Sequence, residues 1–117
     1  MNITRLGVLL IAVIHFGLAI AEIFFGAYFL EKRLDFPPEV AQQAEPIVQN
    51  AGIYNSFIAA GLVWAALAAK QSLALRYFFL SCVIIAGVFG AFTLRPTTLI
   101  LQTVPALIVL GLVWWKR

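Results

Sequence analysis

Residues 6–30 read LGVLLIAVIHFGLAIAEIFFGAYFL, an almost unbroken run of apolar side chains. A bilayer core about 30 Å thick needs roughly 20 helical residues, so this run of about 25 is long enough to cross a membrane. It ends at the charged residues 31–33. The run therefore predicts a first transmembrane helix.

The same run shares features with a secretory signal peptide. Arg5 precedes the apolar segment, and the small residues Ala19 and Ala21 look like a cleavage site. His15 interrupts the segment, however, and apolar residues resume after Glu22, which gives a spanning length rather than the shorter length of a signal peptide. We interpret the run as an uncleaved first helix.

The composition supports a membrane protein. Of the 117 residues, 63% are hydrophobic and only 11% are charged, with a mean hydropathy of +1.00, whereas soluble domains carry roughly 25% charged residues. The net charge is +3, but the basic residues stand in ones and twos beside apolar runs, where they anchor helices. We therefore expect a lipid bilayer as partner and no nucleic acid. Cys82 has no second cysteine to pair with, and we interpret it as a small buried apolar residue.

Three further apolar runs cover residues 46–69, 77–94 and 97–115, and the last two are separated so narrowly that they predict a tight antiparallel hairpin. The polar segment before residue 46 contains a proline pair at 37–38, which suits the first turn of a short surface helix. The runs lack the alternation of a barrel strand, and lipid excludes open sheets. We predict an all-α, integral membrane, antiparallel four-helix bundle that forms one domain over residues 1–117. A longer polar loop or a short surface helix separates its first two helices.

Basic residues are divided unevenly between the two ends of this bundle. The end that holds the termini has Arg5, Lys70, Arg76, Lys116 and Arg117, and the opposite end has Lys32, Arg33 and Arg95. Because cytoplasmic loops carry more Lys and Arg, we expect both termini in the cytoplasm and a multi-pass protein of the inner (plasma) membrane.

Two ionisable side chains lie within the predicted first helix. Glu22 is the only acidic residue inside a predicted span, and His15 is the only histidine of the chain. Placing an ionisable side chain of this kind in the hydrocarbon of a bilayer costs about 3 kcal/mol or more. Their spacing of seven residues puts them on one helix face, about 10 Å apart along the axis. We predict that Glu22 and His15 are catalytic acid and base residues.

Helix direction gathers other polar residues near Glu22. Residues late in the first and third helices lie in the same half of the membrane as residues early in the second and fourth. The polar residues of that half, which we predict to bind a ligand, are Asn50, Tyr54, Asn55, Thr93 and Gln102. The amide and threonine side chains could instead form hydrogen bonds between helices, which are worth about 0.6 kcal/mol each. Tyr54 could instead be an amphipathic residue in the wall of the bundle, with no contact to a ligand. His15 lies deeper.

The chain offers no convincing metal or cofactor site. One histidine, one cysteine and one intramembrane glutamate make a poor ligand set, and neither a phosphate-binding glycine loop nor a nucleophile elbow is present. We expect no metal and no cofactor.

Several sequence blocks resemble one family. His15 and Glu22 are followed by NAGIYNSFIAAGL at 50–62, AGVFGAFT at 86–93 and QTVPA at 102–106. Together these blocks resemble the DUF1304 family of small bacterial membrane proteins over nearly the whole chain. The family pattern after the first helix is approximately Asn-Gln-Gly-Leu-Tyr-Asn-Gly-Phe, from which Ala51 and Ser56 depart. The resemblance implies a four-helix membrane fold and supplies no activity.

Three classes of function remain open. The first is a polar pocket at Glu22, His15 and Asn55 that binds a small lipophilic molecule or acts on it by acid/base chemistry. The second is a proton-coupled transporter or channel, built as a homodimer and similar in size to the small multidrug transporters. The third is a static scaffold, which would tolerate both Glu22→Gln and His15→Ala. Whether the protein is an enzyme is left open by the sequence.

Overall fold

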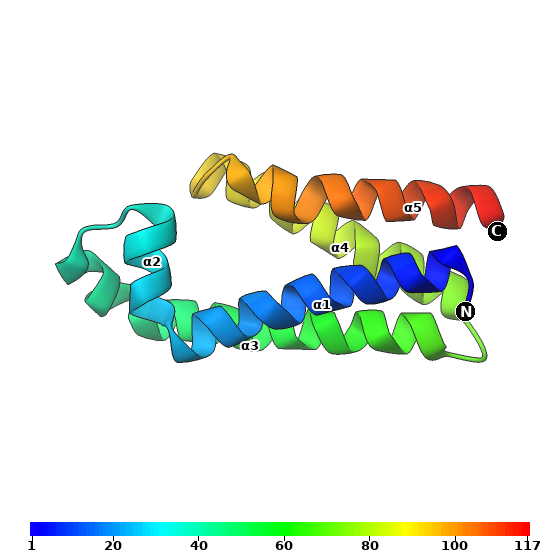
Figure 1. The fold of residues 1–117 in the computed structure, drawn as a ribbon, viewed down its shortest axis with the longest axis horizontal. Coiled ribbons are helices and arrows are strands. Elements are labelled where there is room, and N and C mark those ends of the chain that lie inside the picture. Colours follow the sequence, from blue (N-terminus) through cyan, green and yellow to red (C-terminus); the bar gives the residue numbers. More distant parts are fainter.

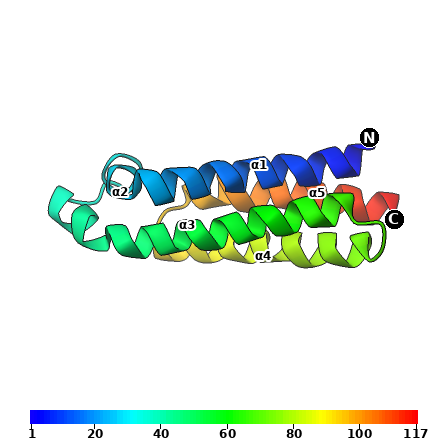
Figure 2. The same ribbon diagram turned by 90° about the horizontal axis from the view of Figure 1, so that it is seen from below.

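The computed structural model describes residues 1–117 and consists of helices and short connections. In chain order these are α1 (Ile3–Phe24), α2 (Gly26–Leu34), α3 (Pro38–Leu67), α4 (Ser72–Thr93), the π-helical turn η1 (Leu99–Thr103) and α5 (Val104–Lys116). The helices α1, α3, α4 and the continuous η1–α5 segment are long and apolar enough to cross a membrane. They run side by side in antiparallel order, with both termini at one end (Figures 1 and 2). The predicted all-α fold with four apolar helices is confirmed.

The bundle is a rod whose longest dimension, 48 Å, is close to the full thickness of about 40–45 Å of a bilayer with its headgroups. Its core is small because most apolar side chains face outward, as they do in a protein surrounded by lipid. The buried core lies in the half of the rod nearer the termini, and all four long helices contribute to it. Its members are Val8, Ile11, Ala12, Leu62, Ala65, Ala66, Leu80, Val83, Ala106, Val109 and Val113.

The helices form two pairs. The helix α1 packs along much of α3, and α4 packs on α3 and on the η1–α5 segment, whereas α1 meets α5 less extensively. One α1–α5 contact is at Gly7, where an added Cβ would lie 3.1 Å from Val109 Cγ2. Figure 1 shows α1 and α5 drawing apart from there toward the end that carries α2. In that half of the rod, α1 therefore has α3 as its main neighbour.

The first predicted helix, over residues 6–30, is not continuous. The helix α1 ends at Phe24, Phe25 leaves helical geometry with φ −132° and ψ 34°, and α2 then turns away from the α1 axis (Figure 1). Gly26 follows this break, and glycine has a low helix propensity. The contacts of α2 with α3 explain its direction, because Gly26 is buried and an added Cβ there would lie 3.3 Å from Glu45 Cγ. The short helix between the first two long helices is therefore α2, which lies earlier in the chain than the surface helix that we expected from Pro38.

The second long helix begins earlier than predicted. We expected a short surface helix from Pro38 and a separate helix from Pro46, but α3 runs unbroken from Pro38 through Pro46. Proline at position 46 removes one backbone hydrogen bond and normally disfavours a helix interior. Packing against α2 offsets this cost, since Ala41 is fully buried within the first turn and a half of α3.

The fourth long helix contains the wide turn η1, which precedes a proline. Pro105 has no N–H to donate and its ring would crowd the carbonyl of residue 101 in a regular α-helix, so a wider turn relieves the conflict. The N–H of Val104 accordingly donates to the carbonyl of Leu99. Two threonines secure this segment to α4, because Thr98 Oγ1 donates to Gly87 O at 2.7 Å and Thr103 Oγ1 donates to Ile84 O at 3.1 Å.

At the end remote from the termini, an ion pair joins the two helix pairs. Asp35, in the left-handed conformation after α2, accepts a hydrogen bond from Arg95 in the turn between α4 and η1. The carboxylate of Asp35 is largely exposed, so solvent screens the attraction and its stabilising effect is small. The pair nevertheless connects the two parts of the rod that diverge most.

Candidate functional site

Glu22 and Asn55 meet across the α1–α3 interface. Asn55 Nδ2 donates a hydrogen bond of 2.5 Å to Glu22 Oε1, and both side chains are half-buried. Glu22 continues the buried stripe of α1 that includes His15 and Ala19, while Asn55 lies one turn from the buried Gly52 and Ala59 on α3. The second carboxylate oxygen of Glu22 and the amide oxygen of Asn55 make no hydrogen bond within the protein. The pair therefore keeps two acceptors free.

Gly52 makes this meeting of helices possible. A Cβ at position 52 would lie 2.7 Å from Ile23 Cγ1, 3.0 Å from Glu22 Cβ and 3.1 Å from the backbone oxygen of Ala19. Small residues allow membrane helices to approach closely, and here the approach is within one turn of Asn55. The same segment of α3 therefore allows α1 to approach closely, through Gly52, and supplies the polar residue Asn55.

His15 lies deeper in the bundle and is only 2% exposed. Its Nδ1 is 3.0 Å from the carbonyl oxygen of Ile11, one turn earlier on α1. Because a carbonyl oxygen only accepts, Nδ1 must carry the hydrogen, and a neutral ring then presents Nε2 as an acceptor. His15 and Glu22 make no hydrogen bond with each other, as expected for residues two helical turns apart.

The structure does not join the other predicted ligand-binding residues to this pair by hydrogen bonds. Asn50 is exposed, and Tyr54 is 62% exposed with its ring edge-to-face against Phe57. Thr93 is exposed, and its hydroxyl donates to the carbonyl of Phe89 within α4. Gln102 is half-buried on η1. Of the pairings that helix direction suggested, the one between Glu22 and Asn55 forms a direct contact.

A scan of family models finds a match over residues 9–114, and the matching family is described as "Protein of unknown function (DUF1304)". The chain belongs to the DUF1304 family. No curated protein and no solved structure matches it. The family assignment and the four apolar helices together indicate a multi-pass membrane protein in a lipid bilayer environment, with an activity that the family description leaves unassigned.

Metal-ligating side chains do not gather in this DUF1304 protein. No group of three or more His, Cys, Asp and Glu residues is close enough to hold an ion. Cys82 is partly buried on α4, away from the Glu22–Asn55 contact on α1 and α3. The chemistry available at the contact is therefore that of a carboxyl group, an amide and, deeper, an imidazole.

Sequence reasoning missed the role of Arg76 in this family member, because it counted this residue only among the basic residues at the end of the bundle that holds the termini. The Arg76 guanidinium donates to Thr4 Oγ1 at 3.0 Å, to Ala65 O at 3.2 Å and to Ala66 O at 3.3 Å. It thereby joins α1, the end of α3 and the start of α4, and it satisfies carbonyls that the end of α3 leaves without helical partners. Its position four residues into α4, where a cation is costly in an apolar helix, was the signal that could have identified it.

Proposed function

We propose that the Glu22–Asn55 contact is the centre of a site for a small lipophilic molecule with one polar group, on which Glu22 and His15 act as acid and base. The observation that carries this proposal is the hydrogen bond between the two side chains, which fixes a carboxyl group inside an apolar bundle. A carboxyl group is a costly way to join two helices in lipid, where an amide pair would serve. A role in chemistry or ligand binding would account for a carboxyl group at this position.

The two residues have complementary roles in this proposal. Asn55 orients the Glu22 carboxyl, leaving its second oxygen free to exchange a proton with a ligand. His15 Nε2 can accept a proton or hydrogen bond about 10 Å further along the same face, so the two groups bracket a ligand rather than acting on each other. Gln102, Thr93, Asn50 and Tyr54 are proposed to orient the polar group of the ligand from the same half of the bundle.

Glu22→Gln is the sharpest test of this proposal. Glutamine keeps the size of the side chain and an oxygen that accepts from Asn55, but it cannot release a proton. We expect the variant to fold normally and to lose about 90% of a lipophilic compound that co-purifies with the wild-type protein, equivalent to about 1.4 kcal/mol of binding. Mass spectrometry of organic extracts from matched amounts of purified protein measures the loss.

The control is Glu39→Gln, which changes an exposed glutamate in the first turn of α3 and should leave the compound in place. Equal retention in Glu22→Gln and wild type would reject the ligand site, as would the absence of any enriched compound in the wild-type extract. Either result favours the scaffold, which needs no titratable group at position 22.

A second function has support from the charge distribution. Glu22 is the only carboxylate within the apolar part of the first helix, as expected if one membrane carboxylate carries protons for a transporter or channel. We propose for this case an inner-membrane homodimer with cytoplasmic termini. Proteoliposomes with an imposed pH gradient would then take up protons, measured by an enclosed pH-sensitive dye, with wild type but not with Glu22→Gln. Equal rates for the two proteins would exclude this function.

A further inference from the structure

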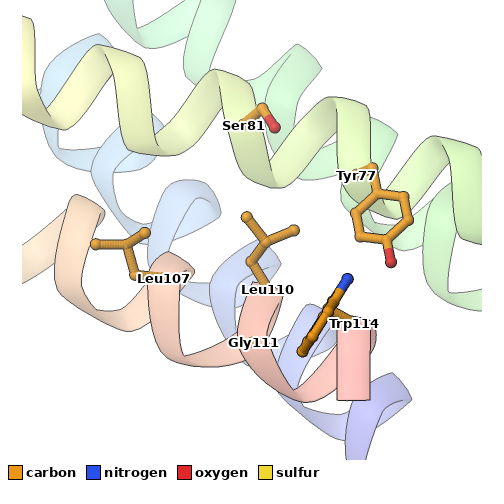
Figure 3. A pocket seen from close by; sticks show the side chains of 6 residues that line it. All are labelled: Tyr77, Ser81, Leu107, Leu110, Gly111 and Trp114. Atoms are coloured by element: carbon orange, nitrogen blue, oxygen red, sulfur yellow. The ribbon is translucent and has the colours of Figure 1, made fainter. Parts of the chain in front are cut away.

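A second candidate site lies on the opposite helix pair, away from Glu22. Tyr77 and Ser81 of α4 and Leu107, Leu110, Gly111 and Trp114 of α5 line an open groove of about 540 Å³. Figure 3 shows the apolar residues of α5 along one side, with the Tyr77 phenol and the Trp114 indole at the same end of the groove. That end is the one at which the chain termini lie.

One residue that lines the groove carries a hydrogen-bond donor that lacks an acceptor. The Tyr77 hydroxyl is buried and has no hydrogen-bond partner in the protein. The same is true of Arg5 Nε on α1, at the same end of the bundle. Buried donors are nearly always paired, so the unpaired hydroxyl of the groove residue Tyr77 indicates that an acceptor comes from outside the chain.

The charges at this end specify the kind of acceptor. The end carries five basic side chains and no acidic one, because all five acidic residues fall between Glu22 and Glu45. The guanidinium of Arg117 lies 5.2 Å from the centroid of the Trp114 ring, which places a cation against one of the residues that line the groove. A ligand with an apolar body and an anionic end would match both the apolar lining of the groove and the basic side chains at this end.

We propose that the α4–α5 groove binds a phospholipid with an anionic headgroup. One acyl chain lies along Leu107, Leu110 and Gly111, the Tyr77 hydroxyl donates to an oxygen of the ester or phosphate, and Arg117 pairs with the phosphate. The groove opens outward between two helices that are apolar enough to face lipid, so a membrane lipid reaches it directly. This site is independent of the chemistry proposed for Glu22.

Gly111 supplies a clean variant for testing the groove. An added Cβ at Gly111 meets no atom within 4 Å, so leucine there fills the groove without disturbing the packing of the bundle. Gly17 on α1 is the matched control, because its added Cβ also meets nothing within 4 Å and it lies outside the groove. Tyr77→Phe removes only the hydroxyl and retains the ring.

The experiment adds palmitoyl-oleoyl phosphatidylglycerol or phosphatidylcholine to the detergent-solubilised full chain and measures the lipid-bound fraction by native mass spectrometry. Wild type should retain phosphatidylglycerol about fivefold more strongly than phosphatidylcholine, because the choline cation of the second lipid cancels the phosphate charge that attracts a basic side chain. Gly111→Leu should weaken phosphatidylglycerol retention about tenfold through lost acyl contact, and Tyr77→Phe about threefold. Gly17→Leu should behave like wild type.

Equal retention of the two lipids by wild type would overturn the proposal, and so would equal retention by Gly111→Leu and Gly17→Leu. Should Gly111→Leu fail to fold, Tyr77→Phe decides the matter, since unchanged lipid retention in that variant also contradicts the assignment. The last measurement adds glycerol 3-phosphate, a soluble phosphate without acyl chains, to the lipid-bound protein. Displacement of the lipid by this soluble phosphate at equal concentration would show a phosphate site without acyl recognition and would overturn the lipid assignment.

Discussion

Replacing Gly52 with leucine is expected to push α1 and α3 apart at the Glu22–Asn55 contact and to lower the free energy of unfolding by about 2–3 kcal/mol. Ile23 can adjust its side chain, but the backbone oxygen of Ala19, 3.1 Å from an added Cβ, cannot move without shifting α1. The separation should also break the hydrogen bond from Asn55 to Glu22. Unfolding of the purified protein in detergent, followed by circular dichroism, measures the loss of stability.

Gly17→Leu is the control for this change, because an added Cβ at Gly17 meets nothing within 4 Å. It introduces the same leucine into a long apolar helix and should leave the free energy of unfolding within about 0.5 kcal/mol of wild type. If Gly52→Leu were as stable as this control, the close approach of α1 and α3 would not contribute to the fold. The spatial basis for the proposed site would then be lost.

Arg76→Leu should produce the second large effect. The substitution removes hydrogen bonds to Thr4, Ala65 and Ala66 and leaves the Ala66 carbonyl without its side-chain partner at the end of α3. With hydrogen bonds to a charged group worth about 1.5–3 kcal/mol and partial exposure weakening them, we expect a total loss of about 3 kcal/mol. Denaturant titration in detergent, followed by tryptophan fluorescence, measures it.

Lys70→Leu is the matched control, because Lys70 is an exposed cation of the same α3–α4 connection and makes no side-chain hydrogen bond. Arg76→Lys should recover only part of the stability, since a lysine ammonium cannot spread its donors over three separated acceptors as a guanidinium does. Equal stability of Arg76→Leu and Lys70→Leu would show that the three contacts contribute nothing to joining the helices.

The number of long helices could be predicted because hydropathy measures directly what lipid requires. Each apolar run was long enough to span, and backbone hydrogen bonding in lipid left helices as the solution. The encounter of Glu22 with Asn55 was also accessible, because antiparallel order and a rise of about 1.5 Å per residue fix the depth of each side chain. Depth narrows the list of partners to one half of the bundle.

The rotation of each helix about its own axis could not be predicted from the sequence as its depth could. Counting residues puts Thr93 and Gln102 in the same half of the membrane as Glu22. Thr93 nevertheless bonds within its own helix, and Gln102 lies on the turn η1 that packs against α4. The face a residue presents depends on packing around small residues. Contacts at Gly87, where an added Cβ would lie 2.9 Å from the Thr103 backbone nitrogen, set that rotation.

The helix boundaries failed where tertiary contacts override local preference. Pro46 favours the start of a helix, but α3 already begins at Pro38 and continues through Pro46. The turn of α3 before Pro46 is stabilised by packing against α2. Phe25 carries no breaking signal of its own, and the chain bends there to bring α2 onto α3. Each of these features depends on a neighbour distant in sequence, which local composition does not report.

The central proposal is that Glu22 and Asn55 act as one ligand site, and a double-mutant cycle on ligand retention tests it most directly. The amount of co-purified compound is compared in wild type, Glu22→Gln, Asn55→Leu and the double variant, each checked for folding by circular dichroism. If the two side chains act as a unit, each single change lowers retention about tenfold and the double change lowers it no further. Losses that multiply to about a hundredfold, or single variants that retain the compound as wild type does, would contradict a shared site.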